Sequence, residues 1–240
     1  PDDLQKKFLP QVLALSEEYS INQLMPLMAK GNSATESEKL EAAKTMSRFS
    51  GISEKAIISY NLDVPTTFFW KELLREEGFT IGRLDSRYKG IDKIAGGDRP
   101  DYWAELTSWN HSFAPAINYY FKNVLKFETD VKYNLFGPVY PWDWKNNNSG
   151  ESLRKAMAAN PYLHTMIQSG YYDGATRYFD AKYTMWQLDP SGKMKDRLSF
   201  EGYRSGHMMY LREVDLIKSN SDIRKFIKKT IPSSTKPAKY

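Results

Sequence analysis

The chain has 240 residues, enough for one domain or one and a half, and 41% of them are hydrophobic, which suffices for a packed core. The absence of cysteine excludes disulfides, thiolate catalysis and cysteine-ligated zinc, and three histidines argue against a multi-histidine metal site. The net charge is +5, but basic residues alternate with acidic ones, which argues against a nucleic-acid interface, and no apolar run approaches the ~20 residues of a membrane span.

The first 60 residues are predicted to be helical. Apolar residues at three- and four-residue spacing predict a helix over residues 4–28. Thr35, followed three residues later by Glu38, is a capping box that predicts the start of a second helix. Ser53 is expected to cap a short helix that ends at Tyr60.

The middle of the chain combines helices with loops rich in aromatic residues. Pro65 lies near the start of a predicted helix that stops at Gly78, and residues 80–109 are predicted to be irregular. Pro115 is expected in the first turn of the next helix, because proline is favoured there. Residues 136–150 are predicted to form another loop.

The pattern changes after Gly150. We predict, in order, a helix over residues 151–159, a buried strand over 162–169, a helix over 175–188, an alternating strand over 194–203, a helix after His207 and a last helix from Ser221 to Lys229. Such a strand-helix-strand-helix order implies parallel strands in a covered sheet. Two strands cannot make such a sheet stable, so further strands are expected, most simply from a missing N-terminal half.

Two short motifs end the two predicted strands. The first is Ser169–Gly174 (Ser-Gly-Tyr-Tyr-Asp-Gly), and the second is Gly202–Met209 (Gly-Tyr-Arg-Ser-Gly-His-Met-Met). They place Asp173 and His207, 34 residues apart, on loops that leave parallel strands. This is the order of the last two members of the Ser, Asp, His triad in α/β-hydrolases, although no Gly-x-Ser-x-Gly precedes them.

The chemistry of a triad fits these two residue types. Histidine is a base near physiological pH, and a carboxylate holds its ring in one tautomer and stabilises the imidazolium. Gly170 and Gly206 are expected to permit tight exits from the strands, through close packing or a positive φ. The alternatives are that Asp173 caps a helix beginning near Ala175 and that His207 is a core histidine.

The other two histidines lack this context. His164 lies inside the predicted strand and is interpreted as structural, whereas His111 is expected on the surface of a loop.

These residues resemble the serine carboxypeptidases, especially their bacterial relatives. The family motif Ser-Gly-Asp-x-Asp is similar to Ser169–Asp173, with Tyr171 at its first Asp, and Gly-x-Gly-His-Met is similar to residues 204–208, with Arg204 at its first Gly. The segments Lys71–Arg75, Gly82–Arg87 and Pro141–Trp144 are also similar, so that the resemblance covers nearly all of the chain.

The resemblance implies an α/β-hydrolase fold. Residues 1–150 would be mostly a helical lid, and residues 151–240 the C-terminal part of the hydrolase core, with the N-terminal strands missing. The family's Gly-Glu-Ser-Tyr nucleophile motif and Asn-Gly-Gly-Pro-Gly oxyanion loop do not occur here. Because the sequence starts at Pro1 rather than Met, we expect a processed product or a fragment that begins after both motifs.

The implied activity is release of C-terminal residues from peptides, with His207 as general base and Asp173 orienting it. The expected partners are a peptide substrate and the N-terminal half that carries the serine, with no cofactor, no metal and no nucleic acid. The chain alone is expected to be inactive, and the family implies a periplasmic or secreted protein. The alternatives are a non-catalytic binding module on the same scaffold, or an esterase or acyltransferase of the same fold.

Aromatic residues of the predicted lid are candidates for the substrate pocket. Packing within the lid is the alternative role for each of them. They are Trp70, Tyr102, Trp103, Trp109, Tyr140 and Trp142.

Overall fold

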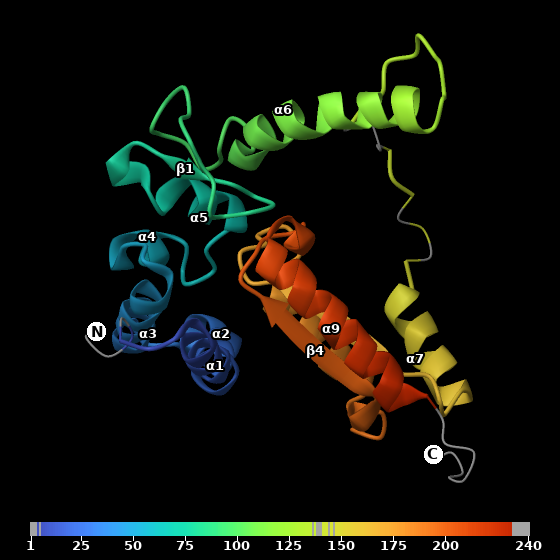
Figure 1. Cartoon of the computed structure of the whole chain (residues 1–240). Helices are drawn as coiled ribbons and strands as arrows, with labels where there is room; N and C mark the ends of the chain where they lie inside the picture. The colour runs from blue at the N-terminus through green and yellow to red at the C-terminus, as the bar shows by residue number, and fades with distance from the viewer. Residues whose placement is uncertain are drawn as a thin grey trace. The chain divides into compact units, whose positions relative to one another are not determined.

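The computed structural model describes residues 4, 6–135, 137, 141–143, 145 and 147–231, which form a mixed α/β protein (Figure 1). The described residues fall into two compact units. The first unit comprises Pro1–Ile81 and Lys89–Tyr102, and the second comprises Gly82–Tyr88 and Trp103–Tyr240. The division into a lid (residues 1–150) and a hydrolase core (residues 151–240) is a separate matter, which these units do not test, and it stays a prediction.

The first unit is mainly helical. Its α-helices are α1 (Leu9–Tyr19), α2 (Met25–Ala29), α3 (Glu36–Ser50), α4 (Glu54–Ser59) and α5 (Thr66–Glu72). A π-helical segment, Ser20–Leu24, joins α1 to α2, so the helix predicted over residues 4–28 is correct in outline. A cluster of buried residues between α3 and the turn after α4 forms the core of this unit: Ala42, Ala43, Ile52, Ile57 and Leu62.

The two helix caps predicted in this unit, at Thr35 and Ser53, are confirmed. The hydroxyl of Thr35 accepts a hydrogen bond from the Glu38 N–H, while the Glu38 carboxylate accepts one from the Thr35 N–H at 2.8 Å, which completes the capping box of α3. The hydroxyl of Ser53 accepts the Ala56 N–H at 3.2 Å at the start of α4. Each cap satisfies an amide that the first helical turn leaves unpaired.

Residues 80–109 are less irregular than predicted. The strands β1 (Thr80–Ile81) and β2 (Lys89–Gly90) pair antiparallel, and α6 extends over Ala104–Tyr119. Pro115 therefore lies inside α6 and not in its first turn, so this prediction is wrong. Burial of the apolar side chains of Ala104 and Trp109 favours the earlier start, against the ~3 kcal/mol that an interior proline costs.

The second unit contains the predicted strand-helix-strand-helix order. Besides α6, this unit contains α7 (Ser149–Ala159), β3 (Thr165–Gly170), α8 (Tyr178–Leu188), β4 (Leu198–Tyr203) and α9 (Glu213–Thr230). β3 and β4 are parallel, in a register that pairs Thr165 with Leu198 and Gly170 with Tyr203. The prediction of parallel strands is confirmed. Within the described residues, their sheet contains these two strands alone.

α9 runs along β4 (Figure 1), and a network of polar side chains links the helix to the sheet. The buried hydroxyl of Tyr203 donates to Asp222 Oδ2 at 3.1 Å and accepts from Gln168 Nε2 at 2.7 Å. Lys218 Nζ lies 2.6 Å from Asp222 Oδ2. The prediction that Ser221 and Asp222 begin a separate helix is therefore wrong, because the Asp222 side chain bonds to the sheet and to Lys218 from the middle of α9.

Asp222 should make the second unit sensitive to acid. Burial raises the pKa of Asp222, but the hydrogen bonds from Lys218 and Tyr203 outweigh it and leave the pKa below its ordinary 3.8. A depressed pKa adds stability that is present above the unfolded-state pKa and lost as pH falls through the folded-state value. We expect Asp222→Asn to lower the free energy of unfolding by about 1–2 kcal/mol at pH 7, and less at pH 3, in urea titrations.

Glu201 provides the matched control for this prediction. Its carboxylate lies 3.4 Å from the same Lys218 ammonium but is 37% exposed, so Glu201→Gln should change stability by less than about 0.5 kcal/mol. Equal losses in the two variants, or a loss in Asp222→Asn that does not shrink at pH 3, would contradict the assignment.

None of the helices in the described residues combines the length and the apolar character needed to cross a bilayer.

Candidate active site

Because β3 and β4 are parallel, the two motif loops leave the sheet at the same edge. We call residues 171–177 the Asp loop and residues 204–208 the His loop. The Tyr171 N–H donates to the Tyr203 carbonyl at 2.9 Å, and the Tyr172 N–H donates to the Ser205 carbonyl at 3.0 Å. Backbone pairing thus continues past the strands and keeps the loops side by side.

Asp173 is buried, with 5% of its side chain exposed, and its carboxylate is held by its own turn. Oδ1 accepts the N–H groups of Ala175 at 2.8 Å and Thr176 at 3.0 Å. Oδ2 accepts the Thr176 hydroxyl at 2.5 Å. Asp173 therefore caps the turn at Ala175 and Thr176. It does not cap a helix beginning near Ala175, as the alternative predicted, because α8 begins only at Tyr178.

Asp173 and His207 meet as predicted. Nδ1 of His207 lies 2.8 Å from Oδ2 of Asp173, and 45% of the histidine side chain is exposed. An ionised carboxylate only accepts, so Nδ1 must donate its proton here, which leaves the Nε2 lone pair of the neutral ring free. Among the residues that the structure describes, no serine hydroxyl is hydrogen-bonded to Nε2.

The glycines of the motifs are required by close packing. A Cβ on Gly170 would lie 2.1 Å from the Gly206 carbonyl oxygen and 2.4 Å from the Ser205 carbonyl oxygen. A Cβ on Gly206 would lie 2.5 Å from the Leu84 carbonyl oxygen. Neither glycine has a positive φ, so the tight exit is confirmed through close approach and not through a left-handed backbone.

Of the two departures from the carboxypeptidase motifs, the Tyr171 side chain packs on backbone, whereas Arg204 is contacted through its backbone carbonyl, which any residue would supply. The Tyr171 ring lies over the backbone of Gly202, where an added Cβ would come within 2.0 Å of the tyrosine hydroxyl. The carbonyl of Arg204 accepts a hydrogen bond from Arg87 Nη1 at 3.0 Å.

His111 and His164 lie apart from the Asp173–His207 pair. His111 is exposed on α6, so it is at the surface as predicted, but on a helix and not a loop. His164 immediately precedes β3, and burial lowers the pKa of its imidazole, with Arg197 and Lys229 acting in the same direction. A neutral, half-buried ring fits the structural role.

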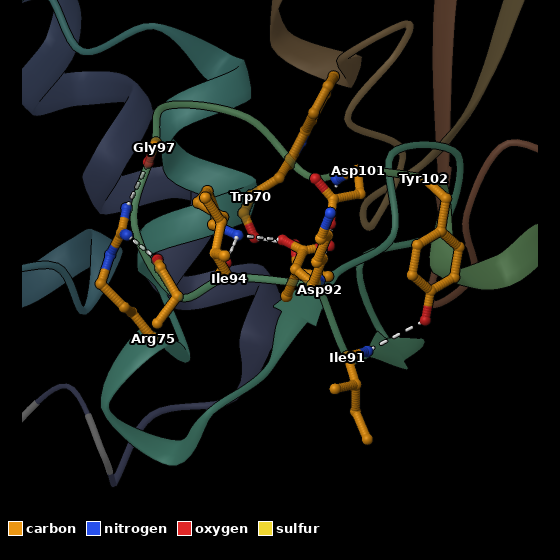
Figure 2. Close-up of polar contacts among 12 residues, drawn as sticks. Trp70, Arg75, Ile91, Asp92, Ile94, Gly97, Asp101 and Tyr102 are labelled. Carbon is orange, nitrogen blue, oxygen red and sulfur yellow. Dashed lines mark hydrogen bonds and ion pairs between the residues drawn. The ribbon is translucent and has the colours of Figure 1, made fainter.

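The predicted lid aromatics differ in exposure. Trp70 and Trp109 are buried, and Trp109 Nε1 donates to the Tyr88 hydroxyl at 3.3 Å, which supports packing for these two. The Trp103 ring stacks with the Arg83 guanidinium at 5.4 Å, and Trp142 is exposed. The Tyr102 hydroxyl accepts the Ile91 N–H at 3.0 Å (Figure 2). Tyr140 lies outside the described residues.

The first unit contains a separate cluster of polar contacts, drawn in Figure 2. The buried Lys71 ammonium pairs with Asp92 and donates to the Ile94 carbonyl at 2.6 Å. Arg75 donates to the Gly97 carbonyl at 2.9 Å. Lys71 thus ties the loop after β2 to α5, and Arg75 ties it to the 3-10 turn Arg75–Glu77, so we assign the cluster a structural role.

Sequence reasoning missed several residues around the Asp173–His207 pair. Thr176 Oγ1 lies 3.1 Å from His207 Nδ1 as well as 2.5 Å from the Asp173 carboxylate. The Asp-x-x-Thr spacing, typical of a capped turn, is the signal that could have found it. Residues 82–88, noted only for their resemblance, contact both motif loops, and their buried partner Glu105 left no sequence signal.

No group of three or more potential metal ligands occurs in the part of the chain that the structure describes. No protein-family model, curated protein or solved structure matches the chain.

Proposed function

We propose that the chain is the Asp- and His-bearing part of a serine carboxypeptidase-like enzyme with an α/β-hydrolase fold. The single observation that carries the proposal is the 2.8 Å contact between His207 Nδ1 and Asp173 Oδ2 on loops that leave adjacent parallel strands. Open α/β sheets place their sites at this edge. The nucleophilic serine comes from a polypeptide outside these 240 residues, since no Gly-x-Ser-x-Gly occurs among them.

In this mechanism His207 first acts as a general base. Nε2 takes the proton of the incoming serine hydroxyl while the serine oxygen attacks the carbonyl carbon of the last peptide bond. Asp173 holds the ring through Nδ1 and stabilises the imidazolium that forms. His207 then gives the proton to the departing amine as the carbon–nitrogen bond breaks, and water hydrolyses the acyl-enzyme by the same proton transfers.

The burial of the pair supports these roles. The Asp173 carboxylate is nearly enclosed and receives three donors besides the imidazole, so it cannot turn away from the ring. The histidine is half exposed, so a substrate and a serine can approach its free nitrogen. A fixed carboxylate behind an accessible imidazole is the arrangement that base catalysis needs.

The test compares the chain alone with the chain joined to the polypeptide encoded immediately before Pro1. We expect no hydrolysis of an N-blocked dipeptide by the chain alone, and no labelling by a fluorophosphonate, because the covalent route needs the serine. The joined protein should hydrolyse the dipeptide and take up one label. Robust turnover by the chain alone would contradict the proposal.

Two alternatives remain as outcomes of this experiment. A joined protein without a reactive serine would indicate a non-catalytic module on a hydrolase scaffold. A panel of peptides and esters, with free and with blocked carboxyl ends, separates a carboxypeptidase from an esterase or acyltransferase, because all three use the same triad.

A further inference from the structure

Residues 82–88, which we call the bracket loop, contact both the Asp loop and the His loop. The Gly174 N–H donates to the Arg83 carbonyl at 2.9 Å, and the Ser86 N–H donates to the Tyr172 carbonyl at 2.9 Å. The His207 N–H donates to the Leu84 carbonyl at 2.7 Å. The position of the bracket loop therefore sets the backbone position of His207.

Glu105, in the first turn of α6, binds the backbone of the bracket loop through its carboxylate. Its side chain is fully buried, and Oε1 accepts the Leu84 N–H at 2.7 Å. The Leu84 peptide thus lies between the Glu105 carboxylate, which receives its N–H, and His207, whose N–H it receives. The N–H and the carbonyl of Leu84 belong to successive peptide groups, so Glu105 and His207 are linked through the backbone position of Leu84. Gly82 makes room for the carboxyl group, because a Cβ there would lie 2.3 Å from Glu105 Oε2.

Glu105 is a costly residue to bury. Within the described residues, Oε2 has no hydrogen-bond partner. Burial raises the pKa of the Glu105 carboxyl, the backbone N–H groups of Leu84, Glu105 and Arg83 oppose this, and the nearby Asp85 raises the pKa further. The neighbouring carboxylate of Asp85, unlike that of Glu105, is paired with a cation, because Arg87 Nη2 lies 2.6 Å from Asp85 Oδ2. A buried, incompletely satisfied carboxyl group that an apolar side chain could replace calls for a reason other than stability.

We propose that Glu105 is a positioning residue, whose carboxyl group holds the Leu84 peptide and through it the orientation of His207 toward Asp173. The catalytic consequence rests on the proposed function, but the orientation of the histidine does not. Loss of the Glu105 acceptor frees the Leu84 N–H and lets the bracket loop shift, and His207 shifts with it.

The test uses the 240-residue chain with ¹⁵N-labelled histidine. The hydrogen-bonded Nδ1 proton of His207 is followed by NMR in the unmodified chain, in Glu105→Gln, which keeps an acceptor, and in Glu105→Met, which fills the space without one. We expect the His207 resonance to be lost or shifted upfield in Glu105→Met and retained in Glu105→Gln, with His111 and His164 unchanged. An unaltered His207 resonance in Glu105→Met overturns the proposal.

Asp215→Asn is the matched control. Asp215, on α9, is also buried with one unpartnered oxygen, but its carboxylate contacts Arg212 and not the bracket loop. The Asp215→Asn variant should leave the His207 resonance unchanged. A shift as large as that in Glu105→Met would overturn the proposal, because loss of any buried carboxylate would then disturb His207.

A second measurement decides the question even if Glu105→Met does not fold. In the unmodified chain, ionisation of Glu105 should move the amide resonances of Leu84 and His207 together in one titration step, and Glu105→Gln should lack that step. Absence of the shared step from the unmodified chain overturns the proposal.

Activity separates the two proposals. In the protein joined to its serine-bearing part, Glu105→Met should lower kcat by about 10- to 100-fold with little change in KM, in the range seen when supporting hydrogen bonds of a site are removed. An inactive joined protein whose NMR results are as expected would reject the hydrolase function and leave the positioning role of Glu105 in place.

Discussion

His207→Ala is expected to lower kcat of the joined, serine-bearing protein by about 10⁴-fold or more, because the imidazole carries the proton in both halves of the reaction. KM should change little, since the ring acts mainly in the transition state. Steady-state hydrolysis of the N-blocked dipeptide measures both constants. Asp173→Asn should give a loss of similar order, since an amide leaves the ring in the wrong tautomer.

The other two histidines are the controls for this prediction. His111→Ala and His164→Ala should retain activity within a few-fold of the parent protein, because neither contacts the Asp173–His207 pair. Near-normal activity of His207→Ala would remove His207 from the mechanism. An equal loss in His111→Ala would instead indicate a general effect of the substitutions on folding.

Gly170→Ala is expected to destabilise the second unit by about 3 kcal/mol or more, at the upper end of the usual cost of overpacking. The added Cβ meets two carbonyl oxygens of the His loop, at 2.1 Å and 2.4 Å, and backbone cannot move aside as a side chain can. The two motif loops must then separate, so the Nδ1 proton resonance of His207 should be lost as well. Urea unfolding and the NMR experiment measure the two effects.

Gly150→Ala is the matched control in the same unit. Its added Cβ would meet only the end of the Leu188 side chain, at 3.0 Å, which can rotate. Because alanine also favours the helix at this position of α7, we expect a change within about 0.5 kcal/mol. A stability of Gly170→Ala equal to that of Gly150→Ala would show that the loops do not pack so closely.

Local chemistry was sufficient to predict much of the fold. The caps at Thr35 and Ser53 satisfy amides within the next few residues, so their effect does not depend on the rest of the chain. The parallel pairing of β3 and β4 followed from the helix between them, because parallel strands need a crossover of that length.

Tertiary contacts explain the predictions that were wrong. Nothing near Pro115 in the sequence indicates that α6 begins at Ala104, since that start depends on burial of Ala104 and Trp109. Asp222 follows a serine as a helix start often does, but its carboxylate bonds to Lys218 and Tyr203 within one continuous helix.

The candidate site was predictable only in part. Asp173 and His207 follow predicted parallel strands, and adjacent strands bring their following loops together. The bracket loop joins them from 85 residues or more upstream of Asp173, and no periodicity or spacing links Leu84 to His207. The motifs therefore predicted that Asp173 and His207 meet, whereas the residues that support them needed the fold.

The turn that encloses the Asp173 carboxylate restricts how this position can change during evolution. The hydrogen bonds from the amides of Ala175 and Thr176 to the Asp173 carboxylate need the short side chain of aspartate, which has a single methylene group. Glutamate would keep the charge but lose these hydrogen bonds, and asparagine would keep the hydrogen bonds but lose the charge. Distant homologues that keep this turn should therefore conserve aspartate here even where the neighbouring tyrosines have diverged, which makes Asp-x-x-Thr a more informative search pattern than the aromatic residues before it.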